Sequence, residues 1–235
     1  MSTLDRQPAT HPPLIAGQRL DPATFHERYE AMPTGIKAEL IGGVVHMPSP
    51  VRSSHGRMSS LIALWLGNYV TETPGLDTGG DATTFLNDDS VPQPDAHLRI
   101  ASGRGGQTYL EKDYIVGAPE FVAEVSGSTR WVDLGPKRQA YERAGVLEYL
   151  VVSLEPAEVH WHVRRGDRFE RVGPDADGIH RSSAFPGLWL DPAALLGIDR
   201  PGLKAILGRG LASAEHAAFA ARVAPPRGED PGVLA

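Results

Sequence analysis

Residues 121–152, FVAEVSGSTRWVDLGPKRQAYERAGVLEYLVV, decide the fold of this chain. Two short apolar runs, at 120–126 and 148–154, have the length of strands, and 134–144 between them has helical spacing. We expect a β-α-β unit whose right-handed crossover helix packs on two parallel strands. Because other short strands surround this unit, the chain is predicted to be an α/β or α+β fold with a central mixed sheet.

Several flanking elements are predicted from capping and turn residues. A helix is expected in DPATFHERYEAM, residues 21–32, with Asp21 as its N-cap and Pro22 at its first position. The stretch 36–47, IKAELIGGVVHM, predicts a hairpin that turns at Gly42-Gly43. A long helix is expected from about Ser53 to Val70, because apolar residues recur there at helical spacing.

The remaining segments are assigned by periodicity and polarity. The runs EVHWHV and RFERV flank Arg165-Gly166-Asp167 and predict a second hairpin. Short strands are expected within 75–100, and 101–118 is predicted to be a polar excursion. The alanine-rich stretch 202–222 is predicted to form a helix.

The chain has 235 residues, which is enough for one domain with a substantial hydrophobic core. We expect residues 1–18, which are polar and proline-rich, to be a flexible arm, and 19–200 to form the domain. Residues 201–235 are expected to add the alanine-rich helix and a disordered tail.

Composition narrows the class of protein. The chain has no cysteine, which excludes disulfides and thiolate chemistry. Neither a secretory signal nor an apolar run of membrane-spanning length is found, so we expect a soluble, cytoplasmic protein.

The net charge of −6 argues against a nucleic-acid coat protein, whose affinity would come from a basic surface, but it does not exclude a nuclease. Six basic residues lie near the candidate site in sequence and either form a local basic rim or are ordinary solvated charges: Arg99, Arg104, Lys112, Arg130, Lys137 and Arg138.

Two carboxylates interrupt predicted strands. In DAHLRI, residues 95–100, Asp95 falls on the face opposite Leu98, so it is expected to project into a polar site. In FVAEVS, residues 121–126, Glu124 lies within an otherwise apolar mid-sheet strand. A carboxylate there must be paired, hydrogen bonded or bound to a metal; a purely structural carboxylate is the alternative.

Lys137 is the third candidate. It lies near the start of the helix after the second carboxylate and shares a stripe with Ala140, Tyr141 and Ala144. A lysine on a buried stripe needs an anionic partner. The alternative is a side chain that reaches solvent at the helix start.

Together these three residues indicate metal-dependent phosphodiester chemistry. Carboxylates on neighbouring strands hold a hard cation such as Mg²⁺, and a cation held in this way activates water against a phosphodiester.

The same residues resemble the Uma-two family of nucleases, part of the PD-(D/E)xK restriction-endonuclease-like superfamily. The resemblance covers about residues 20–198 and is most specific from Gly117 to Val152. Its motifs are AELIGGVVHMPSP (38–50), His55-Gly56-Arg57, PDAHLRI (94–100), GAPEFVAEVSGST (117–129), Asp133-x-x-x-Lys137 and YERAGVLEYLVV (141–152). It implies a restriction-endonuclease-like α/β core, with a central mixed sheet flanked by helices.

The resemblance also implies roles for individual residues. Asp95 and Glu124 are expected to bind Mg²⁺, with Mn²⁺ as a substitute, and Glu39 resembles an additional upstream acidic ligand. Ser126 stands where the motif's lysine usually lies, so Lys137, beside the attacking water, takes that role. Asp133 and Tyr141 match further family positions without an assigned role.

Three histidines remain outside the catalytic set. His55 matches a family position at the start of the long helix, and its alternative is a residue without chemistry. His160 and His162 share one strand face at a spacing that can bind a transition metal. With no third ligand apparent, we expect an exposed hairpin face there.

We therefore predict an Mg²⁺-dependent endonuclease that hydrolyses DNA. The alternative is an inactive nuclease-like scaffold that binds nucleic acid or a protein partner. A homodimer is expected, with the Trp65 helix or the alanine-rich segment as candidate interfaces.

Overall fold

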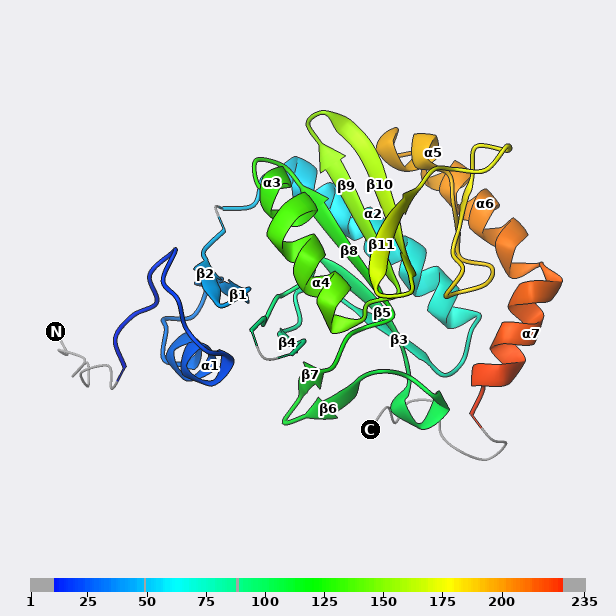
Figure 1. Cartoon of the computed structure of the whole chain (residues 1–235). Coiled ribbons are helices and arrows are strands. Elements are labelled where there is room, and N and C mark those ends of the chain that lie inside the picture. Colours follow the sequence, from blue (N-terminus) through cyan, green and yellow to red (C-terminus); the bar gives the residue numbers. More distant parts are fainter. Residues whose placement is uncertain (1–10, 49, 88, 226–235) are drawn as a thin grey trace, which may run out of the picture.

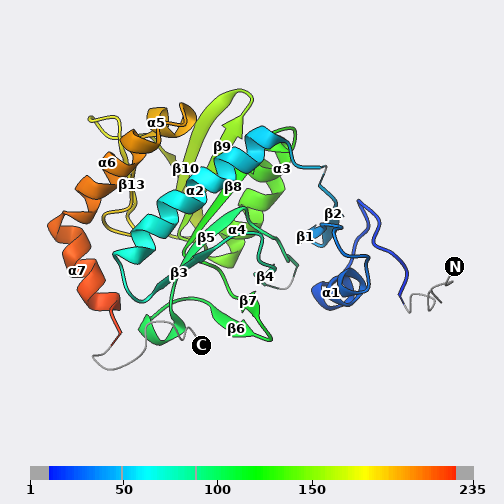
Figure 2. The ribbon, with the colours of Figure 1, turned by 180° about the vertical axis from the view of Figure 1, so that it is seen from behind.

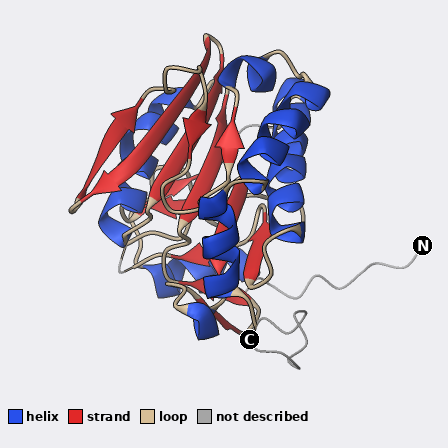
Figure 3. Cartoon of the chain, turned by 90° about the vertical axis from the view of Figure 1, so that its right-hand side faces the viewer, coloured by secondary structure: helices blue, strands red, loops and turns tan. Residues whose placement is uncertain are grey.

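The structure, a computed structural model, describes residues 11–225 except 49 and 88. Its central sheet has six strands in the order β11-β10-β9-β8-β5-β3. Strands β8 and β9 are parallel and the other neighbours are antiparallel, so the sheet is mixed, as predicted. Helices lie on both sides of this sheet (Figure 3).

Figure 1 labels the elements along the chain. The helices are α1 (Pro22–Glu30), α2 (Ser53–Thr71), α3 (Arg130–Val132), α4 (Arg138–Ala144), α5 (Pro192–Leu196), α6 (Arg200–Leu211) and α7 (Ala214–Val223), with a 3-10 turn η1 (Ser102–Arg104) and a π-helical turn η2 (Asp133–Lys137). The strands of the central sheet are β3 (Leu76–Gly79), β5 (Ala96–Ile100), β8 (Phe121–Ser126), β9 (Glu148–Leu154), β10 (Ala157–Arg165) and β11 (Arg168–Val172). The others are β1 (Glu39–Ile41), β2 (Val44–His46), β4 (Thr84–Phe85), β6 (Tyr109–Glu111), β7 (Tyr114–Val116), β12 (His180–Arg181) and β13 (Trp189–Leu190).

The predicted β-α-β unit is confirmed. Strands β8 and β9 pair in parallel from Phe121↔Glu148 to Ser126↔Ser153. The connection between them is helical from Arg130 to Ala144, earlier than predicted, and includes the π-helical turn. Pro136 lies inside that turn and has no N–H for a regular helical hydrogen bond. Such turns are common at functional sites.

Strand alternation separates two cores, as predicted for β8. Phe121, Ala123 and Val125 face α2, α6 and α7 in the larger core, while Val122 faces α4 in the second. Glu124 therefore lies on the α4 side of the sheet. The two helical layers on opposite faces can be followed in Figures 1 and 2.

The flanking predictions for α1, α2 and the first hairpin are confirmed. Asp21 caps α1 by accepting a hydrogen bond of 2.9 Å from Thr24 N. Strands β1 and β2 pair antiparallel, and both Gly42 and Gly43 have positive φ at their turn. The hairpin holds Glu39 at the start of β1, so the turn helps to place a candidate site residue.

Two local predictions are wrong. Residues 101–118 are not a plain polar excursion: they contain η1 and the β6–β7 hairpin, which forms a small sheet with β4. The helix predicted for 202–222 is two helices, α6 and α7, separated at Ser213, whose side chain caps α7. Leu207 on α6 and Phe219 on α7 are buried in the larger core.

The described part of the N-terminal arm packs against the domain. Residues 1–10 and 226–235 of the predicted arm and tail lie outside the described residues. In the described part of the arm, Leu14 is buried and Arg28 donates hydrogen bonds to the carbonyls of Pro12 and Pro13. The domain boundaries themselves remain a prediction.

The interface expected on the Trp65 helix stays a prediction, but the Trp65 side chain itself lies in the core. Trp65 of α2 is only 2% exposed, because it packs against Phe121 and Trp161 under the sheet. It therefore contributes to the core of a single chain. None of the described helices is long and apolar enough to cross a membrane.

Candidate active site

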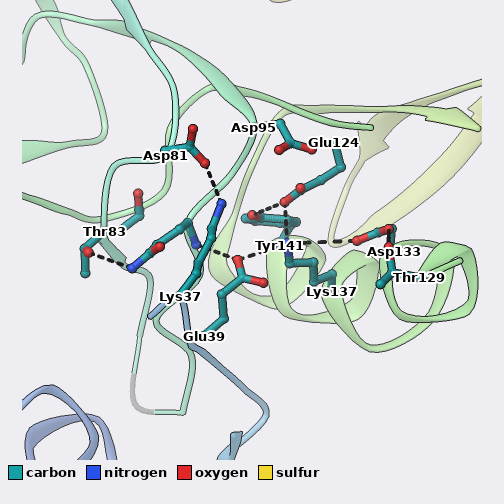
Figure 4. A network of polar contacts seen from close by, with 12 residues as sticks. Lys37, Glu39, Asp81, Thr83, Asp95, Glu124, Thr129, Asp133, Lys137 and Tyr141 are labelled. Atoms are coloured by element: carbon teal, nitrogen blue, oxygen red, sulfur yellow. Dashed lines mark hydrogen bonds and ion pairs between the residues drawn. The ribbon is translucent and has the colours of Figure 1, made fainter. Parts of the chain in front are cut away.

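The predicted site residues come together on the α4 side of the sheet. Glu124 lies on β8, Asp95 directly precedes β5, Glu39 begins β1, and Lys137 ends the π-helical turn. These elements are far apart in the sequence, and Figure 4 shows their side chains turned toward a shared centre. The structure also adds Asp133 to the group, at the other end of that turn.

Lys137 is at the centre of this network. Its Nζ lies 2.9 Å from Glu124 Oε1, 3.0 Å from Glu39 Oε1 and 3.9 Å from Asp133 Oδ1. The lysine side chain is 6% exposed, so the alternative of a solvent-directed lysine is wrong. Burial alone would lower the pKa of Lys137, but the carboxylates outweigh it and raise that pKa well above its ordinary value. Lys137 is therefore a permanent cation.

Glu124 is the least exposed carboxylate of this site. Its Oε1 accepts hydrogen bonds from both Lys137 Nζ and the Tyr141 hydroxyl, each at 2.9 Å. Burial raises the pKa of Glu124 well above its ordinary value, and the charges of Asp95, Asp133 and Glu39 raise it further, against the opposing effect of Lys137. The carboxylates outnumber the cation at their centre, which favours an added positive charge.

Asp95 is held from two sides. Its Oδ2 accepts a hydrogen bond of 2.7 Å from Val125 N and lies 3.3 Å from His55 Nε2. Although burial acts to raise the pKa of Asp95, His55 and the Val125 N–H lower it below its ordinary value. The pKa of His55 is raised, chiefly by its hydrogen bond with Asp95.

Sequence reasoning left two contributors without a role. His55 lies in the first turn of α2 and contacts Asp95, which is distant in the sequence. In the sequence, only its match to a family position indicated a place near the site. Asp133 accepts hydrogen bonds from Ser126 Oγ at 2.6 Å and Thr129 Oγ1 at 3.1 Å. Ser126, which stands in place of the motif's lysine, thus orients the carboxylate beside Lys137. The i, i+4 spacing of Asp133 and Lys137 was the sequence feature that could have predicted their contact, because such residues lie on one face of a helix.

The chemistry of the donor set fits a hard divalent cation. Asp95 Oδ1, Glu124 Oε2 and Glu39 Oε2 accept no hydrogen bond from the described residues, while the second oxygen of each group does. Carboxylate oxygens are the ligands that Mg²⁺ takes in proteins. Within the described part of the chain, no three acidic or histidine side chains are grouped closely enough to form a ready-made metal site. Lys137 separates Glu39 from Glu124, so these two cannot share a cation unless the lysine shifts.

Three members of the predicted basic rim form ion pairs of their own. Arg99 pairs with Asp77, and Arg138 lies 3.6 Å from Glu142. Arg130 donates to Glu158 at 3.0 Å. Of the six basic residues singled out, Lys137 alone reaches the carboxylates.

The histidine pair on β10 differs from the prediction. His160 and His162 are 5% and 7% exposed, so they do not form an exposed hairpin face. His162 stacks on Tyr149 of β9, and the ring of Phe169 on β11 lies tilted beside it. Burial lowers the pKa of His162 to about 4, so it is neutral at pH 7.

Comparison with known proteins identifies the family. The family model Uma2, described as "Putative restriction endonuclease", matches residues 23–193. The chain belongs to this family. The resemblance inferred from the motifs is thereby confirmed. No curated protein matches the chain.

A solved structure shares the fold. It is the crystal structure of a putative nuclease belonging to DUF820 from Anabaena variabilis ATCC 29413. The two chains have a TM-score of 0.56 and 16% sequence identity, and the match covers 73% of this chain and 96% of that one. The predicted α/β fold, a mixed sheet flanked by helices, is thus that of a nuclease-like neighbour.

Proposed function

We propose that this site hydrolyses phosphodiester bonds of DNA with a divalent cation, Mg²⁺ or Mn²⁺. The observation that carries the proposal is the group of Asp95, Glu124, Glu39 and Lys137, the last three of them buried, on the fold of a nuclease family. Burying that many charges costs several kcal/mol per ion unless pairing offsets it. A purely structural role would be met more cheaply by apolar side chains.

The three carboxylates have distinct positions. Asp95, directly before β5, falls opposite Glu124 of β8 when the register that pairs Ala96 with Ala123 is continued by one residue. Each of the two offers an oxygen that accepts no hydrogen bond from the described residues. We assign the cation to these two, with Glu39 as the third carboxylate once Lys137 shifts toward the substrate. A cation bound here supplies a more acidic water and positive charge against the phosphate.

The neighbouring groups hold this arrangement in place. His55 and Val125 N fix Asp95, and Tyr141 fixes Glu124. Asp133, oriented by Ser126 and Thr129, keeps the Lys137 ammonium within the site. Lys137 stays protonated, so it acts by orienting the attacking water or by stabilising charge on the pentacoordinate phosphate, and not as a base.

A cleavage assay tests the proposal. Supercoiled plasmid and linear oligonucleotides are incubated with wild type, Asp95→Asn, Lys137→Met and Glu170→Gln in Mg²⁺, Mn²⁺ or EDTA. Glu170, an exposed residue of β11, serves as the matched carboxylate control. We expect cleavage only with metal, unchanged in Glu170→Gln and reduced roughly 100-fold or more in the site variants.

The opposite results are equally clear. If folded wild-type protein cleaves none of these substrates with either metal, the result favours the alternative of an inactive nuclease-like scaffold. Cleavage that survives in Asp95→Asn would place the chemistry elsewhere.

A further inference from the structure

We infer that the rim of this site binds unpaired nucleobases, with Trp131 as the stacking surface, so that the substrate is single-stranded or locally opened nucleic acid. This inference rests on the proposed function and names its substrate class. Trp131 on α3 is 68% exposed, so most of its side chain is outside the hydrophobic core.

Exposed apolar side chains are concentrated on this rim. Six large hydrophobic side chains are exposed in the described residues, and three of them, Met47, Val51 and Trp131, lie on the two segments beside the site. Scattered exposed apolar residues need no explanation, whereas a group beside a polar site indicates a binding surface.

Contacts at both ends of each segment place them beside the carboxylates. Met47 follows His46, which pairs with Glu39 across the β1–β2 hairpin, and Val51 and Arg52 precede the first turn of α2, where His55 contacts Asp95. Helix α3 lies between Thr129 and Asp133, which hydrogen bond to one another beside Lys137. In Figures 1 and 2 the connection from β2 to α2 approaches α3 at this end of the molecule.

The charges on the rim favour a small number of phosphate contacts. Lys37 pairs with Asp81, Arg130 pairs with Glu158, and Lys137 is buried. Arg52 is exposed and pairs with no acidic residue among those described, and the α2 N-terminus that follows it has no acidic residue in its first turn. Arg52 and the helix end therefore suit one phosphate beside the scissile one.

Unpaired bases match this combination better than a duplex does. Binding of a duplex through many phosphates requires an extended basic surface, whereas this chain has a net charge of −6 and Lys37 and Arg130 on the rim are paired with acidic residues. Stacking of a base on an aromatic side chain is independent of charge and contributes substantially for each base. Trp131 supplies that surface, and Met47 and Val51 are exposed on the β2–α2 connection that approaches α3.

The test is binding measured without cleavage. Fluorescence anisotropy in EDTA compares a labelled single strand with the matching hairpin duplex, for wild type, Trp131→Ala, Trp131→Phe and Tyr109→Ala. Tyr109, an exposed aromatic residue of β6, is the matched control. We expect wild type and Tyr109→Ala to prefer the single strand, Trp131→Ala to lose roughly 5- to 100-fold of that affinity, and Trp131→Phe to recover most of it.

Two results would overturn the inference: tighter binding of the duplex, or unchanged single-strand affinity in Trp131→Ala. Failure of the proposed function is recognised separately, because it would leave single-strand binding dependent on Trp131 but without Mg²⁺-dependent cleavage of the bound strand.

Discussion

Lys137 is the residue on which the charge balance of the site depends. Its ammonium lies among Glu39, Glu124 and Asp133, all of them buried. The sequence predicted Lys137 and Glu124 as site residues because each is a charged residue among the apolar residues of a strand or of a helix face. Sequence alone did not assign His55 or Asp133 a role, because their contacts depend on how distant segments and a π-helical turn are placed.

Replacing Lys137 with Met should destabilise the protein by about 3–5 kcal/mol at pH 7, because three buried carboxylates lose their counter-ion. Denaturant unfolding of wild type, Lys137→Met and Lys137→Arg measures the loss. Added Mg²⁺ should restore part of it in Lys137→Met, since a bound cation neutralises the same carboxylates. Equal stability of Lys137→Met and wild type would contradict the described ion pairs.

His162 gives a pH dependence of stability. Its pKa of about 4 in the folded protein lies below the ordinary value of 6.5, so the unfolded chain binds more protons between these two values. The stabilising effect of the neutral ring is complete above pH 6.5 and is lost as the pH falls toward 4.

Lowering the pH from 7 to 5 should therefore cost about 2 kcal/mol of unfolding free energy through His162. Urea unfolding of wild type and His162→Phe at both pH values isolates this share, because the other histidines are common to both proteins. An identical pH effect in the two proteins would exclude the assignment.

At the scale of elements, most predictions that rested on periodicity or turn residues held. The six buried positions of α2, Met58, Leu61, Ile62, Trp65, Leu66 and Tyr69, are those expected from helical spacing. The β6–β7 hairpin was missed because its strands are short, with two of the three residues of β6 exposed, so no apolar alternation marks them. The exposed-face prediction for β10 failed because residues outside this hairpin cover its histidines: Tyr149 of β9 stacks on His162, and Arg130 of α3 contacts His160.

The β1–β2 turn links backbone conformation to the site. Gly42 has φ +57° and no atom close to where a Cβ would lie, so conformation alone limits substitution. We expect Gly42→Val to destabilise the protein by about 1–2 kcal/mol and to lower activity by displacing Glu39, whereas Gly42→Asn, which tolerates this φ, should be nearly neutral. Thermal unfolding measures the stability of the two variants, and the cleavage assay measures their activity. Equal stability and activity of Gly42→Val and Gly42→Asn would contradict a requirement for positive φ at this turn.

For the whole molecule, the main departure from the sequence-based picture is at the C-terminal end. Helices α6 and α7 supply Leu203, Leu207 and Phe219 to the core under α2. Composition described this stretch only as alanine-rich, and its packing depends on which face of α2 remains open after the sheet is formed. The expected homodimer remains a prediction for sedimentation measurements.

Leu207→Ala should lower the unfolding free energy by about 2–5 kcal/mol, since it leaves a cavity beneath α2. Lys204→Ala, an exposed change on the same helix, should stay within about 0.5 kcal/mol of wild type. Denaturant unfolding of wild type and the two variants measures these changes in unfolding free energy. Similar small effects of the two would mean that α6 is only loosely docked.

The central claim is that Asp95 and Glu124 form a divalent cation site. Its most direct test is isothermal calorimetry with Mn²⁺ and Mg²⁺ on wild type, Asp95→Asn and Glu124→Gln, with Glu170→Gln as control. The account predicts binding by wild type and the control and its loss in both site variants. Absence of binding in folded wild type, or binding unchanged by Asp95→Asn, would contradict it.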